Sequence, residues 1–520
     1  MIFTDYLTTA RTNQCKFLGH FGHRRGLGIF LAYVAVRYAT NQPLDQKNER
    51  RPHARAPSRS GAAQTPKFIS QDSKDMTTLA EAPPASPCSS VAMGQTEKTM
   101  PASKSGLEQR YCGVRGFSGR LCETLEPEDC VVQTMPETSP AKWHLAHTSW
   151  FFETFVLKRF LTGYRSQHPQ FEFLFNSYYN AVGPFFSRPH RGLLSRPTVH
   201  EVFQYRTHID GLVSDLIEAA DEELLAKLEP ILILGLHHEQ QHQELMLTDI
   251  KHVFWQNPLR PVFRKREAVR AATSPGMEWL RFEEGLHWVG HEGEGFSYDN
   301  EGPRHRAFVP SFGLASKLVT NADFLSFIKN GGYRRPELWL SLGWSAVKER
   351  GWEAPLYWEN REGKWFTMTL GGMTELVPEE PVCHVSMFEA DAYARWSGAR
   401  LPTEEEWELA ASGLPIKGNF AESEVFHVEP LATPVPRGRP AQMFGDVWEW
   451  TQSSYSAYPG YSAVPGALGE YNGKFMCNQY VLRGGSCATS ESHIRRTYRN
   501  FFPPDARWQF AGIRLAKDLI

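Results

Sequence analysis

The chain has 520 residues, which is too long for one hydrophobic core, so we expect two folded domains with tails. Apolar residues make up 41% and charged residues 22%, with 15 Trp, 18 Tyr and 33 Phe, a composition that fits a folded enzyme and excludes disorder throughout. The 56 basic residues nearly balance the 58 acidic residues, so the net charge does not predict binding to nucleic acid or to an anionic membrane. Small-molecule chemistry is the class that remains.

Residues 1–104 are rich in Arg, Ser, Pro and Ala, a composition that cannot bury enough apolar surface to fold. We interpret them as a disordered tail. It is either an organelle transit peptide within residues 1–75 or an upstream extension of the reading frame, with Met76 opening the natural protein, and we favour the extension. The apolar run at 26–36 is far shorter than the roughly 20 residues of a spanning helix. Eight scattered cysteines without a CxxC pair then predict a cytoplasmic protein with reduced thiols rather than disulfides.

Residues 105–265 have apolar positions that return every three or four residues, which predicts a helical bundle. The periodicity is clearest at 143–161, 198–220 and 222–254. Between the first two segments, residues 171–196 are aromatic, carry arginines and are punctuated by Gly and Pro. This texture predicts a long functional loop.

After a basic linker at 266–275, residues 276–520 change to short β-like pieces, Gly-rich turns and Trp clusters. One clear helix is predicted at 387–397, and an apolar strand candidate at 511–515 lies near the C-terminus. This region is therefore expected to be a second domain of the α+β class.

Three histidines stand out as candidate metal ligands. His238 and His242 are four residues apart, so on a helix their imidazoles lie on one face and can reach the same ion. The run 143–148, WHLAHT, adds a third histidine from another predicted helix, although spacing alone does not separate His144 from His147. The alternative is that these are core histidines with local hydrogen bonds. Imidazole ligands suit iron, zinc and copper, so they do not select the metal.

A zinc protease is a competing interpretation, because residues 238–242, HEQQH, match the HExxH pattern literally. In such enzymes the glutamate after the first histidine acts as general base. The character of the C-terminal region favours a different family.

Two sets of motifs carry a resemblance to that family. Residues 143–153 and 238–244 resemble the DinB-like four-helix bundle of EgtB-type hercynine sulfoxide synthases of ergothioneine biosynthesis. The C-terminal region resembles the formylglycine-generating-enzyme fold, a C-type-lectin-like fold, through motifs at 319–321, 381–386, 399–404, 445–450 and 483–486. The pairing of the two, in this order, extends over residues from about 105 to 517.

The resemblance implies an Fe(2+) enzyme that uses O2 to form a C–S bond between hercynine (trimethylhistidine) and cysteine and to oxidise the sulfur to a sulfoxide. The metal ligands implied are His147, His238 and His242. Gln241 would hold the imidazole ring of hercynine. The segment 498–502, from Tyr498 to Phe502, would receive its trimethylammonium and carboxylate groups, with Asn500, Phe501 and Phe502 as the contacting residues.

The thiol substrate implied is free cysteine. Tyr178 and Tyr179 match a tyrosine pair of the cysteine-using members, in which at least one hydroxyl would donate a proton. Arg188 and Arg191 would grip the cysteine carboxylate. Members that use γ-glutamylcysteine have an acidic residue where Phe502 stands here, which favours cysteine.

Other functions remain as alternatives: the same reaction with γ-glutamylcysteine, an ovothiol-type 5-histidylcysteine sulfoxide synthase, a zinc-dependent DinB-like thiol transferase, or a non-catalytic ligand-binding protein. The ovothiol-type family usually carries an additional methyltransferase domain, for which no residues remain. A formylglycine generator would need a pair of reactive cysteines, but only Cys477 and Cys487 are available, and Arg499 stands near the expected second position. We therefore expect the second domain to be a substrate-binding wall.

Overall fold

The structure, a computed structural model, describes residue 88 and residues 103–265, 276–293, 295–431 and 438–519. These residues all belong to one compact unit of the chain. Nearly all of the expected tail, including Met76, and the whole expected linker at 266–275 lie outside the described residues. No helix in the described ranges has both the length and the apolar character needed to cross a membrane.

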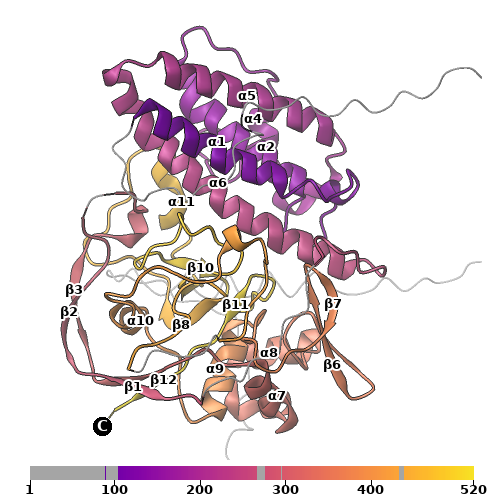
Figure 1. The fold of residues 1–520 in the computed structure, drawn as a ribbon, viewed down its shortest axis with the longest axis vertical. Helices are drawn as coiled ribbons and strands as arrows, with labels where there is room; N and C mark the ends of the chain where they lie inside the picture. The colour runs from indigo at the N-terminus through magenta and orange to yellow at the C-terminus, as the bar shows by residue number, and fades with distance from the viewer. Residues whose placement is uncertain (1–87, 89–102, 266–275, 294, 432–437, 520) are drawn as a thin grey trace, which may run out of the picture. The chain divides into compact units, whose positions relative to one another are not determined.

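The first described region is helical (Figure 1). It contains α1 (Lys104–Arg120), α2 (Ala141–Phe152), α3 (Lys158–Phe160), α4 (Phe171–Phe175), α5 (Val199–Ala219) and α6 (Glu222–Gln256), with a π-helix at Glu153–Leu157 and 3-10 helices at Asp129–Val131 and Arg188–Leu193. Helices α1 and α2 each pack against both α5 and α6. A helical N-terminal region is thus confirmed, while its membership of the DinB-like bundles stays a prediction.

Local sequence signals explain where the two long helices begin. The Thr198 side chain accepts a hydrogen bond from the Glu201 amide, and Glu201 bonds back to the Thr198 amide, which forms a capping box at the start of α5. Asp221 caps α6 through the Leu224 amide. In the interior, buried Arg115 of α1 pairs with Asp210 of α5 at 2.6 Å and with Glu239 of α6 at 2.8 Å. This network ties the three helices together and orients the face of α6.

The second described region combines short sheets with helices, as expected for an α+β domain. Its strands are β1 (Trp279–Phe282), β2 (Gly285–Val289), β3 (His305–Val309), β4 (Phe312–Ala315), β5 (Trp358–Arg361), β6 (Lys364–Thr369), β7 (Gly372–Glu375), β8 (Trp448–Ser454), β9 (Tyr480–Arg483), β10 (Asn500–Phe502), β11 (Ala511–Gly512) and β12 (Ala516–Asp518). They form sheets in the orders β1-β4-β12, β10-β9-β8-β11, β2-β3 and β5-β6-β7.

The helices of this region are α7 (Asn321–Lys329), α8 (Ser341–Arg350), α9 (Met387–Trp396), α10 (Glu404–Ala410) and α11 (Glu470–Gly473). Only α9 was predicted as a clear helix. The others are short and depend on caps and tertiary packing more than on a long apolar period, as the Thr320 and Thr403 capping boxes of α7 and α10 illustrate. The strand expected at 511–515 is confined to Ala511–Gly512, which pairs in parallel with β8.

The four-stranded sheet lies against α6 through one carboxylate. Glu244 of α6 accepts hydrogen bonds from Trp448 Nε1 at 2.7 Å, Ser486 Oγ at 2.6 Å and Thr489 Oγ1 at 2.7 Å. Trp448 opens β8, and the two hydroxyl residues follow β9 closely. Because β9 also pairs with β10, this contact brings Asn500–Phe502 close to the helical region.

The cysteines correct one expectation. Cys88 and Cys112 form a disulfide, although scattered reduced thiols were predicted. A Cβ added to Gly116 of α1 would come within 2.6 Å of the Cys88 carbonyl oxygen, so this glycine lets the earlier segment approach the helix one turn from Cys112. A tertiary approach of this kind leaves no spacing signal. The other cysteines within the described residues, Cys122, Cys130, Cys383, Cys477 and Cys487, are free.

Candidate metal centre and substrate cavity

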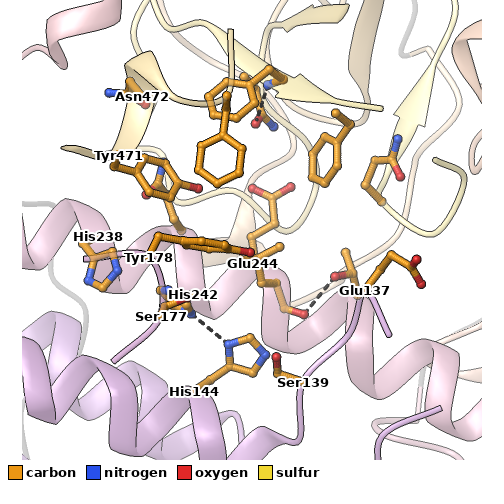
Figure 2. A pocket seen from close by; sticks show the side chains of 18 of the residues that line it. Glu137, Ser139, His144, Ser177, Tyr178, His238, His242, Glu244, Tyr471 and Asn472 are labelled. Carbon is orange, nitrogen blue, oxygen red and sulfur yellow. Dashed lines mark hydrogen bonds between the residues drawn. The ribbon is translucent and has the colours of Figure 1, made fainter. Parts of the chain in front are cut away.

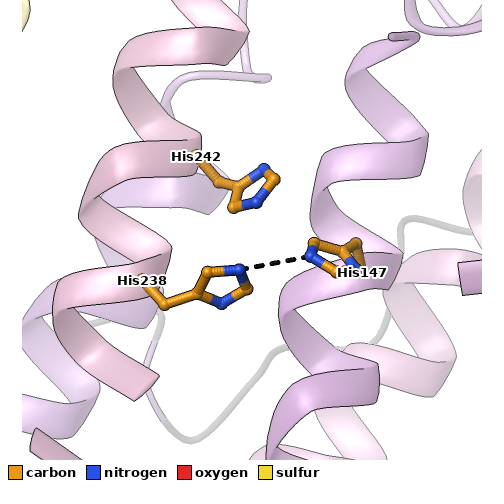
Figure 3. Close-up of side chains that lie close together, drawn as sticks. All are labelled: His147, His238 and His242. Carbon is orange, nitrogen blue, oxygen red and sulfur yellow. Dashed lines mark hydrogen bonds between the residues drawn. The ribbon is translucent and has the colours of Figure 1, made fainter. Parts of the chain in front are cut away.

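Three imidazoles from two helices meet between α2 and α6. His147 comes from α2, while His238 and His242 lie one turn apart on α6 (Figure 3). One ring nitrogen of each lies within 4.8 Å of the others, and His147 Nε2 is 3.2 Å from His238 Nε2. The structure therefore brings together the three histidines that the resemblance implied, in an arrangement that can hold one metal ion.

The hydrogen bonds of two of these histidines leave one nitrogen free in each. His147 Nδ1 lies 2.5 Å from the Phe175 carbonyl oxygen, which can only accept, so Nδ1 carries the hydrogen and Nε2 keeps its lone pair. His144 Nε2 donates to the Asp249 carboxylate at 3.1 Å, so His144 Nδ1 accepts from His242 Nδ1 at 2.8 Å. His242 is thereby left with a free Nε2.

These hydrogen bonds distinguish the role of His144 from that of His147, which spacing alone could not do. His144 is buried between a carboxylate and a ligand imidazole, the position of a residue that orients a metal ligand from behind. Asp249, which also accepts the Ser139 amide at 2.8 Å, was missed in the sequence because it lies 105 residues from His144 along the chain.

Burial keeps the three imidazoles neutral, the form that binds metals. It lowers the pKa of His238 to about 4, with His144 adding to the effect. Burial and the neighbouring imidazole of His238 hold the pKa values of His147 and His242 well below the ordinary range. His238 Nδ1 is buried without a hydrogen-bond partner in the described part of the chain. The other ring nitrogen, Nε2, lies 3.2 Å from His147 Nε2 and is the one that points into the cluster.

The histidines open into a cavity of about 230 Å³ between the helical region and the four-stranded sheet (Figure 2). All the residues predicted for the site line it: His147, Tyr178, Tyr179, Arg188, Arg191, His238, Gln241, His242, Asn500, Phe501 and Phe502. The lining also includes Tyr498 of the predicted segment 498–502, and Glu244, Tyr298, Trp448, Tyr471 and Phe475, which were not predicted for the site. Tyr471 and Phe475 come from the segment 470–475, which carried no motif.

Arg188 donates to the Tyr178 hydroxyl, whereas Arg191 donates to serine hydroxyls. Arg191 is only 3% exposed, donates to Ser139 Oγ at 2.9 Å and Ser177 Oγ at 3.2 Å, and stacks 3.3 Å over the Trp143 ring. Burial, with the nearby Arg188, lowers its pKa to about 9. Within the described residues it has no carboxylate within ion-pair distance. A desolvated cation of this kind favours the arrival of an anionic group.

The tyrosine pair divides between two environments. Tyr178 Oη accepts a hydrogen bond from Arg188 at 2.6 Å, and its ring meets Phe475 of the second region edge-on. Tyr179 is buried against Trp150 and Phe155, and burial raises the pKa of its hydroxyl. Both hydroxyls therefore have a hydrogen to give.

The tyrosine loop is attached to the second region by α11. Glu470 accepts the backbone amides of Asn180 and Ala181, both at 3.1 Å, and Lys474 donates to the Tyr178 carbonyl oxygen. The expected long loop at 171–196 is real but is interrupted by α4 and by a 3-10 helix. Its position depends on contacts almost 300 residues away in sequence.

Comparisons with known proteins agree with this arrangement. The family model described as Sulfatase-modifying factor enzyme 1-like domain matches residues 265–433 and 440–519. A hercynine oxygenase of Mycobacterium tuberculosis is 33% identical over 435 residues, which cover 79% of this chain and 99% of the relative. The chain belongs to the hercynine oxygenase family. A member from Mycolicibacterium thermoresistibile is 34% identical over 74% of this chain and 88% of its own length, and one from Mycolicibacterium smegmatis is 36% identical over 55% and 71%.

Membership of the hercynine oxygenase family confirms the resemblance drawn from the motifs, including the second domain, and confirms that the protein is an enzyme of the oxygenase class. The Mycobacterium tuberculosis relative matches along 99% of its length, so the match includes both the helical region and the second region.

The site also argues against a zinc protease, the competing reading of the HEQQH run. Glu239 does not face the cavity: it pairs with Arg115 at 2.8 Å and with Arg206, and accepts from Ser118 Oγ at 2.6 Å. Burial alone would raise its pKa, but the two arginines outweigh burial and lower it to about 2. A buried carboxylate held this way cannot act as a general base.

The second region of this hercynine oxygenase family member carries no reactive cysteine pair within the described residues. Cys487 is fully buried, Cys477 is exposed, and they are not bonded to each other. Arg499, near the expected second cysteine position, is buried and pairs with Glu404 at 2.8 Å. The region contributes a wall of the cavity, as expected.

Proposed function

We propose that the protein is an iron(II)-dependent oxygenase that joins hercynine to cysteine and yields hercynylcysteine sulfoxide, a step of ergothioneine biosynthesis. One observation carries the proposal: three neutral imidazoles line an enclosed cavity that also presents an amide, Gln241, and a buried cation, Arg191. A metal, an imidazole substrate and an amino-acid carboxylate each find a matching group there. The relatives named hercynine oxygenase support the identity of the imidazole substrate.

The donor set fits iron(II), because His147 and His242 each keep a free Nε2 and His238 is held neutral. Three imidazoles on one side leave positions for substrates on the other. When bound, iron(II) supplies the redox chemistry with O2 that redox-inert zinc cannot supply.

The imidazole substrate lies against Gln241. Its Nε2 is occupied by Tyr498 Oη at 2.7 Å, which leaves Oε1 to accept the imidazole N–H. The trimethylammonium group meets the aromatic rings of Phe501 and Phe502, a contact favoured by cation–π attraction. Asn500 at the start of β10 adds an amide to the same wall.

Cysteine is bound through its carboxylate by Arg191, with Arg188 nearby. The buried guanidinium gains a charge partner, which offsets its desolvation. Phe502 stands where an acidic residue would serve a γ-glutamyl substrate. The apolar side chain at this position favours the smaller thiol.

Tyr178 and Tyr179 are the proton donors of the proposed reaction. Each holds its hydroxyl hydrogen near the reacting sulfur side of the cavity, and one of them donates it during the oxidation. The overall reaction balances without an external reductant. One C–H and one S–H bond break, one C–S and one S–O bond form, and the second oxygen atom leaves as water with both hydrogens.

The test is a set of parallel incubations of the purified full chain. The protein is loaded with iron(II) and mixed with O2 and hercynine plus cysteine, hercynine plus γ-glutamylcysteine, or histidine plus cysteine, and products are identified by mass. We expect hercynylcysteine sulfoxide from the first mixture and much less product from the others.

Controls separate the alternatives. A preparation loaded with zinc, and one kept free of O2, should both be inactive. Activity with zinc or without O2 would instead indicate a thiol transferase, preference for γ-glutamylcysteine would overturn the assignment of cysteine, and turnover of histidine would indicate the ovothiol-type reaction.

A further inference from the structure

A line of four hydrogen-bonded side chains runs from the cavity to α1 of the first region. Tyr498 Oη lies 3.1 Å from His493 Nε2, His493 Nδ1 lies 3.0 Å from His237 Nδ1, and His237 Nε2 lies 3.1 Å from Arg110 Nη2. The two histidines are 1% and 2% exposed, whereas Arg110 of α1 is half-buried. Of the four, only Tyr498 belonged to a segment with a predicted role.

Arg110 sets the direction of every hydrogen bond in this line. A guanidinium has donors and no acceptor, so His237 Nε2 must accept. A neutral imidazole that accepts at Nε2 carries its hydrogen on Nδ1, so His237 donates to His493 Nδ1. By the same rule His493 carries its hydrogen on Nε2 and donates to Tyr498 Oη. A protonated His237 would set its own Nε2–H against the Arg110 donor, so this contact requires the neutral imidazole.

The consequence falls on the Tyr498 hydroxyl. Its oxygen accepts from His493 and also from Gln241 Nε2 at 2.7 Å, so both lone pairs are used. Burial raises the pKa of Tyr498, so the hydroxyl keeps its hydrogen. Within the part of the chain that the structure describes, Tyr498 Oη has no third partner, and the residue lines the cavity. The hydrogen is therefore available to a bound molecule.

This inference rests on the proposed function, which identifies the substrate group that can accept the Tyr498 hydrogen. Hercynine offers an imidazole N–H, which Gln241 Oε1 accepts, a second imidazole nitrogen, which faces the histidine cluster, and a trimethylammonium group, which neither donates nor accepts. Its carboxylate is the one remaining acceptor. A hydroxyl that must donate fits a carboxylate oxygen and no other part of this substrate.

We propose that Arg110, acting through His237 and His493, is a positioning residue that fixes the Tyr498 hydroxyl as a hydrogen-bond donor to the substrate carboxylate. The side chain of Arg110 touches neither substrate nor metal. Arg110 prevents the reverse arrangement of hydrogen bonds, in which Tyr498 would donate to His493 and its hydrogen would point away from the cavity.

The experiment compares two ligands that differ only in the carboxylate. The dissociation constants of hercynine and of its decarboxylated counterpart, trimethyl-2-(imidazol-4-yl)ethylammonium, are measured by calorimetry on the iron(II)-loaded full chain without O2. The variants are Tyr498→Phe, Arg110→Gln and Arg110→Lys. Arg120→Gln, which changes a half-buried arginine at the other end of α1, is the matched control.

We expect Tyr498→Phe to weaken hercynine binding roughly 10- to 100-fold, the value of one hydrogen bond to a charged group, and to leave the counterpart within about twofold. Arg110→Gln should weaken hercynine by about three- to tenfold, because an amide can donate or accept and no longer imposes one direction. Arg110→Lys, which keeps a donor without an acceptor, should restore binding, and the control should match the unaltered protein.

The inference is overturned if Arg110→Gln weakens both ligands equally, which would mean a general structural effect, or if it weakens neither while Tyr498→Phe weakens hercynine. Should Tyr498→Phe fail to fold, the Arg110 pair still decides. A failure of the proposed function is recognised separately, because the unaltered protein would then bind neither ligand.

Discussion

The two walls of the cavity both contain buried arginines but surround them differently. On the sheet wall, Arg499 donates to Glu404 at 2.8 and 2.9 Å. Burial alone would lower its pKa, but the carboxylate outweighs burial and raises it. On the helical wall, Arg191 meets only serine hydroxyls, and burial lowers its pKa to about 9. The paired arginine belongs to the scaffold, and the arginine without a carboxylate marks a place for an anion from outside.

Behind the sheet wall, other arginines of the second region are also paired: Arg483, Arg495 and Arg514 with Glu408, Glu301 and Glu449. The helical wall presents imidazoles and phenols beside Arg188 and Arg191. Chemistry is therefore expected on the helical wall and stability on the sheet wall, and the following variants test that division.

The largest effect is expected from His242→Ala. Loss of one imidazole should remove most of the bound iron and reduce sulfoxide formation to background. The fold should persist, because the contacts of His242 with α2 are one hydrogen bond to His144 and ring contacts with Trp143 and His147. Iron content, activity and thermal unfolding are measured together. His252→Ala, on the same helix but outside the cluster, should retain iron and activity.

Replacing both Tyr178 and Tyr179 by Phe should lower the rate of sulfoxide formation by roughly 10²- to 10⁴-fold, the usual value of a positioned proton donor. Oxidation should then shift toward cysteine sulfinate, measured by mass in the same assay. Tyr164→Phe, which removes a hydroxyl bonded to Glu153 and absent from the cavity lining, is the control. An unchanged product ratio in the double variant would refute the role given to the pair.

The direct test of the two walls compares Arg499→Met with Arg191→Met. Arg499→Met leaves buried Glu404 with Arg483 at 3.8 Å as its remaining cation, so the free energy of unfolding should fall by about 3 kcal/mol. Arg191→Met should leave that free energy within about 1 kcal/mol of its value and raise the KM for cysteine by roughly 10- to 100-fold. The free energies of unfolding are measured by denaturant titration. Equal losses in the two variants would contradict the proposed difference between the two walls.

A smaller effect is expected from Asp249→Asn. The amide can present its nitrogen to His144, which frees the opposite tautomer and loosens the orientation of His242. Metal affinity should fall by about 10- to 100-fold, as for other residues that support a ligand from behind. Competition with a coloured chelator measures the metal affinity. An unchanged affinity would show that His144 does not orient His242.

Motifs predicted the parts of the site that lie on regular elements. Helical spacing placed His238 and His242 on one face, and the resemblance placed His147 and Gln241 with them. What the sequence could not show are contacts between distant segments, such as Asp249 with His144, Arg110 with His237, and the Cys88–Cys112 disulfide. These depend on how whole helices pack, and single residues in them carry no periodic or spacing signal.

The placement of Glu244 has a consequence for turnover. This carboxylate lies two residues from the candidate ligand His242 on α6, so the contact with the sheet wall and two candidate metal ligands belong to one helix. Opening the cavity by swinging the two regions apart would break the Glu244 contacts and expose a buried carboxylate. The element free to yield is the tyrosine loop, held by Glu470 through two backbone amides. Product release is thus expected to depend on movement of that loop and on breaking its hydrogen bonds to Glu470.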